Sequence, residues 1–320
     1  MKKRYRVWLF LGGVAFVVLG PYLWSRVASP GRRIRMRESS QIEAQKHATG
    51  RIRVACYNIA HGRGLNVDNW TDDSEAERLA RLDEIAELLR EVDADVVALN
   101  EVDFACSWSH GVNQAEYLAE KAGYRYFAEE RNLDFRVVNY TWKFGNAILS
   151  KHPIKKAEEI SYPSYQTWEN RMAGKKRGIC CELDLGNSTV RIASIHLSHR
   201  SEDVRVESAR MLCDLAKQDA SPLIIAGDFN STPPGFALSK NSAAGENAIA
   251  VLDESQLFHG LPESMPDASG MTFRADDPTH VIDWIMIPAS WQFTSYEAID
   301  STLSDHRPIV ATIETSSEPQ

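Results

Sequence analysis

From Arg51 onward, short apolar runs alternate with longer segments of helical periodicity, and this alternation restricts the fold more than any other feature of the chain. Apolar residues recur at helical spacing over 75–91 and 201–218, so we expect a helix in each segment. Strands interleaved with helices predict α/β layers, which we assign to one domain over residues 51–314. The apolar runs that we interpret as strands are 52–58, 95–100, 145–150, 179–185, 189–195, 223–227, 281–287 and 308–313.

Residues 7–24 contain no charged side chain and follow a basic flank at residues 1–6. This run of 18 residues is close to the roughly 20 that a helix needs to cross a hydrocarbon core of about 30 Å. We expect a single-pass transmembrane helix, followed by a basic and polar linker over residues 25–50, with a polar tail at 315–320. A signal peptide cleaved near residues 27–29 is the alternative, and the protein would then be secreted. Basic residues on both sides of the run leave its orientation in the membrane open.

Net charge differs between the two parts of the chain. Residues 1–50 contain 10 Lys/Arg against 2 Asp/Glu, whereas the remaining 270 residues contain 26 against 42. A protein that binds long nucleic acid mainly through its phosphates is expected to have the opposite charge. The acidic domain therefore argues against a nuclease, although a local basic groove can exist in an acidic whole.

Polar residues directly follow several of the expected strands. In LIIAGDFN, residues 223–230, Asp228 and Asn230 come two positions apart after a buried strand, so their side chains point the same way. A carboxylate and a carboxamide on one face can hold a nucleophilic water on one side and a phosphoryl oxygen on the other. The alternative is an Asx-type turn in which both residues only cap the backbone.

Two further motifs carry groups suited to metal binding and proton transfer. In SDHRPI, residues 304–309, Asp305 adjoins His306, which suits a metal ligand beside a general base. At the end of another apolar run, Glu101 offers the hard oxygen ligands that Mg²⁺ prefers. Taken singly, the first motif is also compatible with a surface loop and the second with a charge at a helix start.

In this order, the motifs resemble those of the endonuclease/exonuclease/phosphatase superfamily over about 260 of the 320 residues. Two of them are more similar to bacterial metal-dependent hydrolases than to DNA-repair endonucleases: the opening motif and GNAILSKHPI. The resemblance implies an α/β fold, a four-layer sandwich of two mixed β-sheets flanked by helices, with the site at one edge. The motifs are YNIAHGRG (57–64), ALNEVD (98–103), FGNAILSKHPI (144–154), SIHLSH (194–199), GDFNSTPP (227–234), IDWIMI (282–287) and SDHRPI (304–309).

The resemblance also implies a metal-dependent mechanism. Glu101 would be the main ligand of a Mg²⁺ or Mn²⁺ ion, and Asn58 and Asp305 would complete or support its coordination. His306 would take a proton from the attacking water, while Asp283 would orient its imidazole ring and favour the charged form.

The remaining site residues would contact the nucleophile and the phosphate. Asp228 and Asn230 would position both groups. His196 would contact the phosphate or act as an acid, with Asn146 as its hydrogen-bond partner. Arg177 would contact the phosphate, unless it is only a solvated basic residue at a strand start. Three other histidines near the motifs are expected to be peripheral: His61, His199 and His280.

The superfamily acts on many phosphoesters with nearly the same residues, so fold and metal site do not name the substrate. Because of the anchor and the acidic domain, we expect a monomeric, membrane-anchored phosphodiesterase or phosphatase for a lipid headgroup or small phosphoester. A membrane-tethered nuclease with the same site is the first alternative, and nucleic acid is then the substrate. A non-catalytic membrane scaffold is the second, against which the complete set of motif residues argues.

Specificity is expected to come from four long loops rich in aromatic residues. These side chains could stack on a base, close over a sugar or dip into a membrane, or they could simply fix the loops to the domain. The loops are 63–74, 104–116, 129–143 and 161–176, and their aromatic residues include Trp70, Trp108, Phe135, Tyr140, Trp142, Tyr162, Tyr165 and Trp168.

Overall fold

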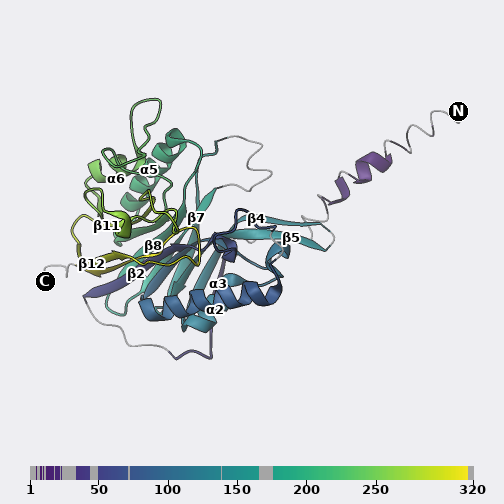
Figure 1. Ribbon diagram of the computed structural model, residues 1–320, viewed down its shortest axis with the longest axis horizontal. Helices are drawn as coiled ribbons and strands as arrows, with labels where there is room; N and C mark the ends of the chain where they lie inside the picture. The colour runs from purple at the N-terminus through teal and green to yellow at the C-terminus, as the bar shows by residue number, and fades with distance from the viewer. Residues whose placement is uncertain are drawn as a thin grey trace.

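Two β-sheets pack face to face, and helices cover their outer faces (Figure 1). The computed structural model describes residues 34–43, 50–70, 73–137, 139–165 and 176–315, together with scattered positions between 5 and 23.

Both sheets are mixed. In spatial order, the seven-stranded sheet contains β1 (Ile34–Glu38), β4 (Tyr126–Val137), β5 (Tyr140–Ser150), β3 (Val96–Asp103), β2 (Arg51–Asn58), β13 (Ile309–Glu314) and β12 (Gln292–Ala298). The six-stranded sheet contains β10 (Phe258–Gly260), β11 (Asp283–Pro288), β9 (Leu223–Asp228), β8 (Thr189–His196), β7 (Arg177–Asp184) and β6 (Ile154–Ser161). The pairs β2–β3 and β8–β9 are parallel, and the other pairs are antiparallel.

In the described part of the chain, four α-helices form the outer layers. Ser74 caps the first of them with a capping box that includes Glu77, and Ser201 caps the third, as its position before the expected helix suggests. The helices on the seven-stranded sheet are α2 (Glu75–Val92) and α3 (Gln114–Ala122), and those on the six-stranded sheet are α5 (Glu202–Lys217) and α6 (Ala248–Glu254). Short 3₁₀ turns are η1 (Ala60–Gly62), η2 (Ser107–Ser109) and η3 (Ala268–Gly270).

Three buried apolar clusters fill the three spaces between these layers. Leu82 and Leu89 of α2 pack on the outer face of the seven-stranded sheet. Val54 and Ile192 meet between the two sheets, and Leu212 of α5 packs on the outer face of the six-stranded sheet. The predicted sandwich of two mixed sheets flanked by helices is confirmed.

The strands that sequence patterns did not indicate include several with many charged residues. β1 and β6 are edge strands with the sequences IRMRE and IKKAEEIS, and charges of this kind protect a sheet edge from further pairing. β4 buries Glu129, Glu130 and Arg131, whose charges hide its strand character. Because β1 lies in the expected linker, the folded domain extends upstream of residue 51. Also missed were β10, β12, α3 and α6.

The N-terminal anchor stays a prediction. The described positions between residues 5 and 23 are helical and mostly exposed. Within the part of the chain that the structure describes, no helix combines the length and apolar character needed to span a bilayer. The expected cleavage site near 27–29 lies outside the described residues.

Gly227, the residue before Asp228, packs closely against the neighbouring strand β8 and against Asn100 of the opposite sheet. Its φ is +141°, and a Cβ atom built there would lie 2.1 Å from the carbonyl oxygen of Ile195 and 2.8 Å from Oδ1 of Asn100. Glycine is therefore required at this position, because a side chain would collide with the neighbouring strand and with the opposite sheet.

We expect Gly227→Ala to destabilise the domain by about 3 kcal/mol, through backbone strain and a clash with fixed backbone atoms. Gly186→Ala is the matched control, because Gly186 also has a positive φ (+86°) but no atom within 4 Å of the added Cβ. That control should cost about 1 kcal/mol. Denaturant unfolding measures both variants, and equal losses would show that the close approach is unimportant.

Candidate active site

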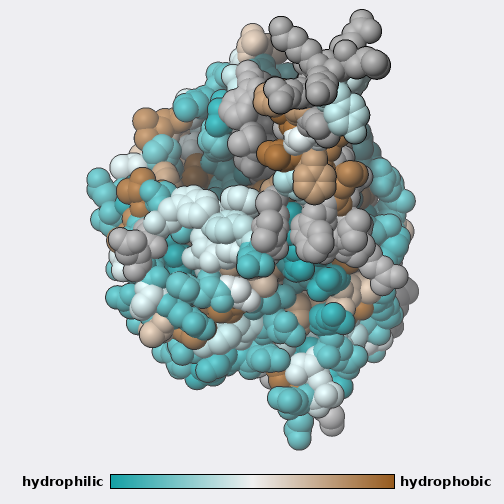
Figure 2. All heavy atoms as spheres, turned by 90° about the vertical axis from the view of Figure 1, so that its right-hand side faces the viewer, coloured by the Kyte–Doolittle hydropathy of each residue, from teal (hydrophilic) through white to brown (hydrophobic). Residues whose placement is uncertain are grey.

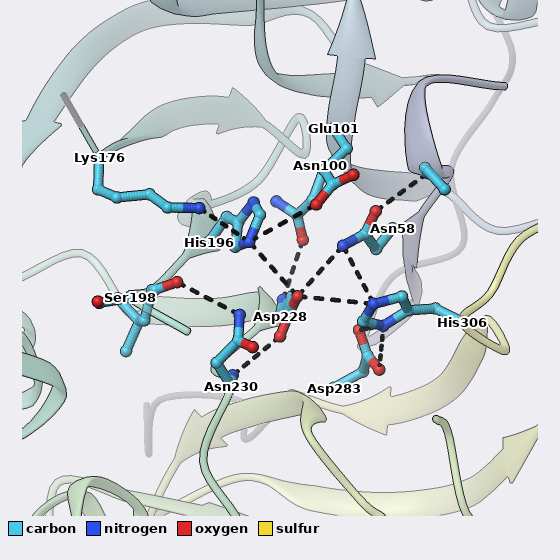
Figure 3. A network of polar contacts seen from close by, with 12 residues as sticks. Asn58, Asn100, Glu101, Lys176, His196, Ser198, Asp228, Asn230, Asp283 and His306 are labelled. Carbon is cyan, nitrogen blue, oxygen red and sulfur yellow. Dashed lines mark hydrogen bonds and ion pairs between the residues drawn. The ribbon is translucent and has the colours of Figure 1, made fainter. Parts of the chain in front are cut away.

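Polar residues from both sheets meet at one edge of the sandwich, where they line a cavity of about 330 Å³ (Figure 3). The strands of each parallel pair end side by side at this edge: Asn58 beside Asn100, and His196 beside Asp228. Six of the ten predicted site residues line the cavity, so most of the predicted set converges: Glu101, His196, Asp228, Asn230, Asp305 and His306. Asn58 and Asp283 contact His306 from behind this lining.

His306 lies between two buried carboxylates. Its Nδ1 is 2.9 Å from Oδ2 of Asp283, and its Nε2 is 3.8 Å from Oδ2 of Asp228. Burial by itself lowers the pKa of His306, but the charges of Asp283 and Asp228 outweigh it and raise the pKa to about 10. The ring is therefore an imidazolium at neutral pH, held in place by Asp283.

Asp228 both caps a turn and faces the site. It therefore combines the two roles that its motif suggested, an Asx-type turn and a residue of the active site. Its Oδ1 accepts a hydrogen bond from the backbone N–H of Asn230 (2.8 Å), which is the Asx-type contact. Its Oδ2 accepts from Nδ2 of Asn58 (3.1 Å) and faces His306. Burial, and then the charge of Asp283, raise the pKa of Asp228 to about 7, although the charge of His306 lowers it.

Asn58 is positioned by the turn that follows β2. Its Oδ1 accepts a hydrogen bond from the backbone N–H of Ala60 (3.0 Å), and its Nδ2 lies 3.3 Å from Nε2 of His306. The amide therefore connects the start of η1 with the carboxylate–imidazole group. In this arrangement Asn58 contacts the proton-transfer residues directly.

A β-bulge turns Glu101 toward the cavity. The pairing of β3 with β5 shifts between Leu99 and Val102, and Glu101 itself has a φ of +51°. Its Oε2 lies 3.2 Å from Nη1 of Arg63 and 3.4 Å from Nε2 of His61. Burial raises the pKa of Glu101, but the neighbouring cationic groups, His61 foremost, lower it far below the usual range. The side chain is therefore a carboxylate.

Arg63, which no motif argument singled out, bridges the two carboxylates that were predicted as metal ligands. Its Nη1 contacts Glu101 as above, and its Nη2 lies 3.1 Å from Oδ2 of Asp305. Its Nε donates to the backbone carbonyl of Asn66 (2.9 Å), which fixes the guanidinium. The signal was available in the YNIAHGRG motif, but only the folded chain shows which carboxylates this arginine serves.

His61, expected to be peripheral, lies against Glu101 and is itself paired with Asp103. Its Nδ1 is 2.7 Å from Oδ1 of Asp103, which also accepts a hydrogen bond from Nε1 of Trp108 (2.6 Å) through its other oxygen. Burial lowers the pKa of His61, but Asp103 and Glu101 raise it above its ordinary value. Asp103 follows Glu101 by two residues, a spacing that could have indicated a second carboxylate near the site.

The donor set fits a hard divalent cation. The carboxylates of Glu101 and Asp305 both contact the guanidinium of Arg63, so the two groups are close enough to bind one cation together. Mg²⁺ is typically bound through one or two carboxylates with water and substrate oxygens. A second group, Asp228, Asp283 and His306, has ligand atoms within 4.8 Å of one another. Because both ring nitrogens of His306 already face these carboxylates, we interpret the second group as proton-transfer machinery.

His196 lies on the opposite wall with a lysine that sequence reasoning missed. Its Nε2 is 3.0 Å from Nζ of Lys176, 3.5 Å from Oδ2 of Asp228 and 3.9 Å from Oε1 of Glu101. Burial, followed by the charge of Lys176, lowers the pKa of His196 well below its ordinary value. A neutral imidazole and an ammonium group therefore face the cavity together, and both suit contact with phosphoryl oxygens.

Two predicted site residues join strands instead of lining the cavity. Asn146 accepts a hydrogen bond from Nδ2 of Asn100 (2.8 Å) and donates one to the backbone carbonyl of Arg177 (2.8 Å). Its amide therefore bonds these two residues and not His196, the partner that we had expected. The Arg177 guanidinium is buried against Glu159 (3.0 Å) and the backbone carbonyl of Asn132 (2.8 Å). Lys176, its neighbour in the chain, occupies the cavity wall.

The other two histidines that we expected to be peripheral lie at the margin of the site. His199 lines the cavity. His280 contacts the ring of Phe273 with centroids 6.0 Å apart, and Phe273 packs on the ring of His306 at 4.8 Å. The ring of Phe273 thus lies between His280 and His306.

The chain matches the model of the Endonuclease/Exonuclease/phosphatase family over residues 55–306. It is similar to a solved endonuclease/exonuclease/phosphatase from Beutenbergia cavernae DSM 12333, with 21% identity, a TM-score of 0.60 and coverage of 82% of this chain and 71% of that one. It is also similar to a mannosyl-6-phosphatase from Bacteroides thetaiotaomicron VPI-5482 (16% identity, TM-score 0.57, coverage 82% and 99%) and to a humanized D. rerio TDP2 (16%, 0.55, 83% and 100%). No curated protein matches the chain by sequence. At these identities, the likeness to solved structures shows a shared fold.

The raised pKa of His306 makes stability depend on pH. The folded protein holds the His306 proton up to about pH 10, whereas an unfolded histidine loses it near 6.5, so this contribution is fully present below pH 6.5 and is lost as the pH rises toward 10. We expect the free energy of unfolding to fall over this range, and to fall less in Asp283→Asn.

His306→Gln serves as the second variant of this test, because it removes the titrating group itself. Urea unfolding at several pH values between 6 and 10 measures all three proteins. Parallel pH slopes for the wild type and both variants would contradict the pairing of His306 with Asp283.

Proposed function

The chain belongs to the endonuclease/exonuclease/phosphatase family, whose members are phosphoester hydrolases, and on that premise we propose that it is a membrane-anchored, metal-dependent phosphodiesterase or phosphatase. Its substrate would be a lipid headgroup or a small phosphoester. The observation that carries the proposal is the convergence of two groups on one cavity: the Glu101–Asp305 carboxylate pair, and His306 between Asp283 and Asp228.

A Mg²⁺ or Mn²⁺ ion held by Glu101 and Asp305, with Asn58 nearby, would neutralise the charge of the phosphoryl oxygens. On the opposite wall, Lys176 and neutral His196 would bind and orient the same phosphoryl group. Arg63 offsets part of the negative charge of Glu101 and Asp305, so the two carboxylates can lie close together before substrate binds.

Asp228 is the group best suited to accept the proton of the attacking water. Its pKa near 7 lies where a general base works best at neutral pH. His306, which the family resemblance assigns as the base, carries its own proton in this arrangement. As an imidazolium it would stabilise negative charge that develops during attack, while Asp283 keeps the ring oriented.

The substrate class is inferred from cavity size, charge and the apolar N-terminal segment. A cavity of about 330 Å³ lies at the small end of the range for sites that hold a small organic ligand. Beyond residue 50 the chain has 42 acidic against 26 basic residues, which disfavours a long polyanion. A membrane-tethered nuclease with the same residues is the second candidate, and its discriminating test is the substrate itself.

We expect the full-length protein in detergent, with Mg²⁺ or Mn²⁺, to hydrolyse bis-p-nitrophenyl phosphate and phospholipid in mixed micelles while leaving plasmid DNA largely intact. Glu101→Gln should lower the rate by about 10³-fold, because it removes a charged metal ligand. His110→Gln is the control, because that ring is exposed and bonds only the backbone of Asp73 in the described structure. Faster cleavage of DNA would instead support the nuclease, and no hydrolysis of any of the three substrates would support the scaffold.

We further expect kcat/KM for bis-p-nitrophenyl phosphate to rise with pH and level off above about pH 7, the pKa of Asp228. Asp228→Asn should lower the rate about 10³-fold at the plateau. A rise that continues to about pH 10 would assign the base to His306 instead, since that is where its ring loses a proton.

A further inference from the structure

Five aromatic side chains pack against one another beside the active site, in a cluster that we call the aromatic ridge: Trp70, Trp108, Phe135, Tyr140 and Trp142. Trp70 is exposed, and the other four are partly buried. The rings of Tyr140 and Trp142 lie 4.3 Å apart, and Trp70 stacks on Tyr140 at 5.6 Å. Trp108 and Phe135 extend the ridge on either side, each with its neighbouring ring 5.7 Å away. Trp70 is 60% exposed, and Val67 in the same loop is 90% exposed.

The ridge leads directly into the catalytic cavity. Trp108 contacts the ring of Phe144 at 5.8 Å, and Phe144 contacts His61 at 5.2 Å. Phe144 and His61 both line the cavity. A surface on which the ridge rests would therefore lie next to the cavity mouth.

The strand β1 begins on the side of the sheet that carries the ridge. β1 runs antiparallel to β4, with Glu38 opposite Tyr126 and Ile34 opposite Glu130. Ile34, where β1 begins, therefore lies nearer than Glu38 to the β4–β5 hairpin that carries Phe135, Tyr140 and Trp142.

The apolar segment at residues 7–24 is close enough to share a membrane with the ridge. The chain from residue 24 to residue 34 spans at most about 35 Å when fully extended. Figure 2 shows the face of the molecule on the right-hand side of Figure 1, where apolar and hydrophilic residues both reach the surface. Arg35 and Arg37 are exposed on β1, where they suit anionic headgroups.

We propose that the aromatic ridge rests in the headgroup region of a phospholipid bilayer, so that the mouth of the catalytic cavity faces the membrane surface. Tryptophan and tyrosine concentrate at this depth because their rings are apolar and their N–H and O–H groups are polar. This inference rests on the proposed function, because the N-terminal anchor would hold the domain next to a membrane. It deepens that function, because the substrate would be a phosphoester presented by a lipid of the same leaflet.

The first test locates the ridge relative to lipid in the full-length protein. The five native cysteines are buried and free, so a cysteine introduced on the surface can be labelled selectively with an environment-sensitive fluorophore. Labels at Val67→Cys and Asn139→Cys report on the ridge, and a label at Met211→Cys on α5 reports on the far side of the domain (Figure 1).

In nanodiscs of phosphatidylcholine with phosphatidylglycerol, nitroxide-labelled lipids should quench the fluorophores at positions 67 and 139 strongly and the one at 211 weakly. Equal quenching at all three positions, or none at the ridge, would overturn the proposal. This readout requires no catalysis, so it stands even if no phosphoester is hydrolysed and the proposed function fails.

The second test separates docking from chemistry. Trp70→Ser should reduce hydrolysis of vesicle phospholipid about tenfold, because one interfacial aromatic group is lost, and should leave hydrolysis of water-soluble bis-p-nitrophenyl phosphate unchanged. Trp70→Tyr keeps an interfacial ring and should retain most vesicle activity. If Trp70→Ser lowers both activities equally, the ridge belongs to the substrate site and the docking proposal is wrong.

Discussion

A buried asparagine, Asn100, connects the two sheets directly beneath the site. Its Oδ1 accepts a hydrogen bond from the backbone N–H of Asp228 (2.9 Å), while its Nδ2 donates to Oδ1 of Asn146 (2.8 Å) and lies 3.3 Å from Oγ of Ser194. Glu101 comes from one sheet and Asp228 from the other. The distance between metal-binding and proton-transfer groups therefore depends on this contact, which is strong because an unpaired amide would be costly in so dry an interior.

Two cationic side chains, to which the family resemblance assigned no role, balance the negative charges of the site. Arg63 serves Glu101 and Asp305, and Lys176 faces the cavity beside His196. Arg63 lies in the loop after η1, and Lys176 directly precedes β7. The loops thereby help to determine how many negative charges the site can hold, even though the sheets deliver most of the acids.

Much of the fold and of the site could be predicted from the sequence because buried strands read as apolar runs and end in polar residues. Edge strands such as β1 and β6 could not, since their charged residues mask the pattern. The roles of Arg63 and His61 also escaped prediction. They depend on a left-handed turn at His61 and on the bulge at Glu101, which together direct side chains that periodicity alone does not place.

The last described strand, β13, lies between β2 and β12 and pairs with β2 residue by residue, from Ile309 opposite Cys56 to Glu314 opposite Arg51. The contact between Asn58 and His306 can therefore form only after nearly the whole domain has been synthesised. Such distant pairing is slow to form, because a long loop must close first. During translation, the nascent chain consequently passes through a stage in which the carboxylates of β3 and β9 exist but His306 does not, and the site is complete only when the last strand has been synthesised.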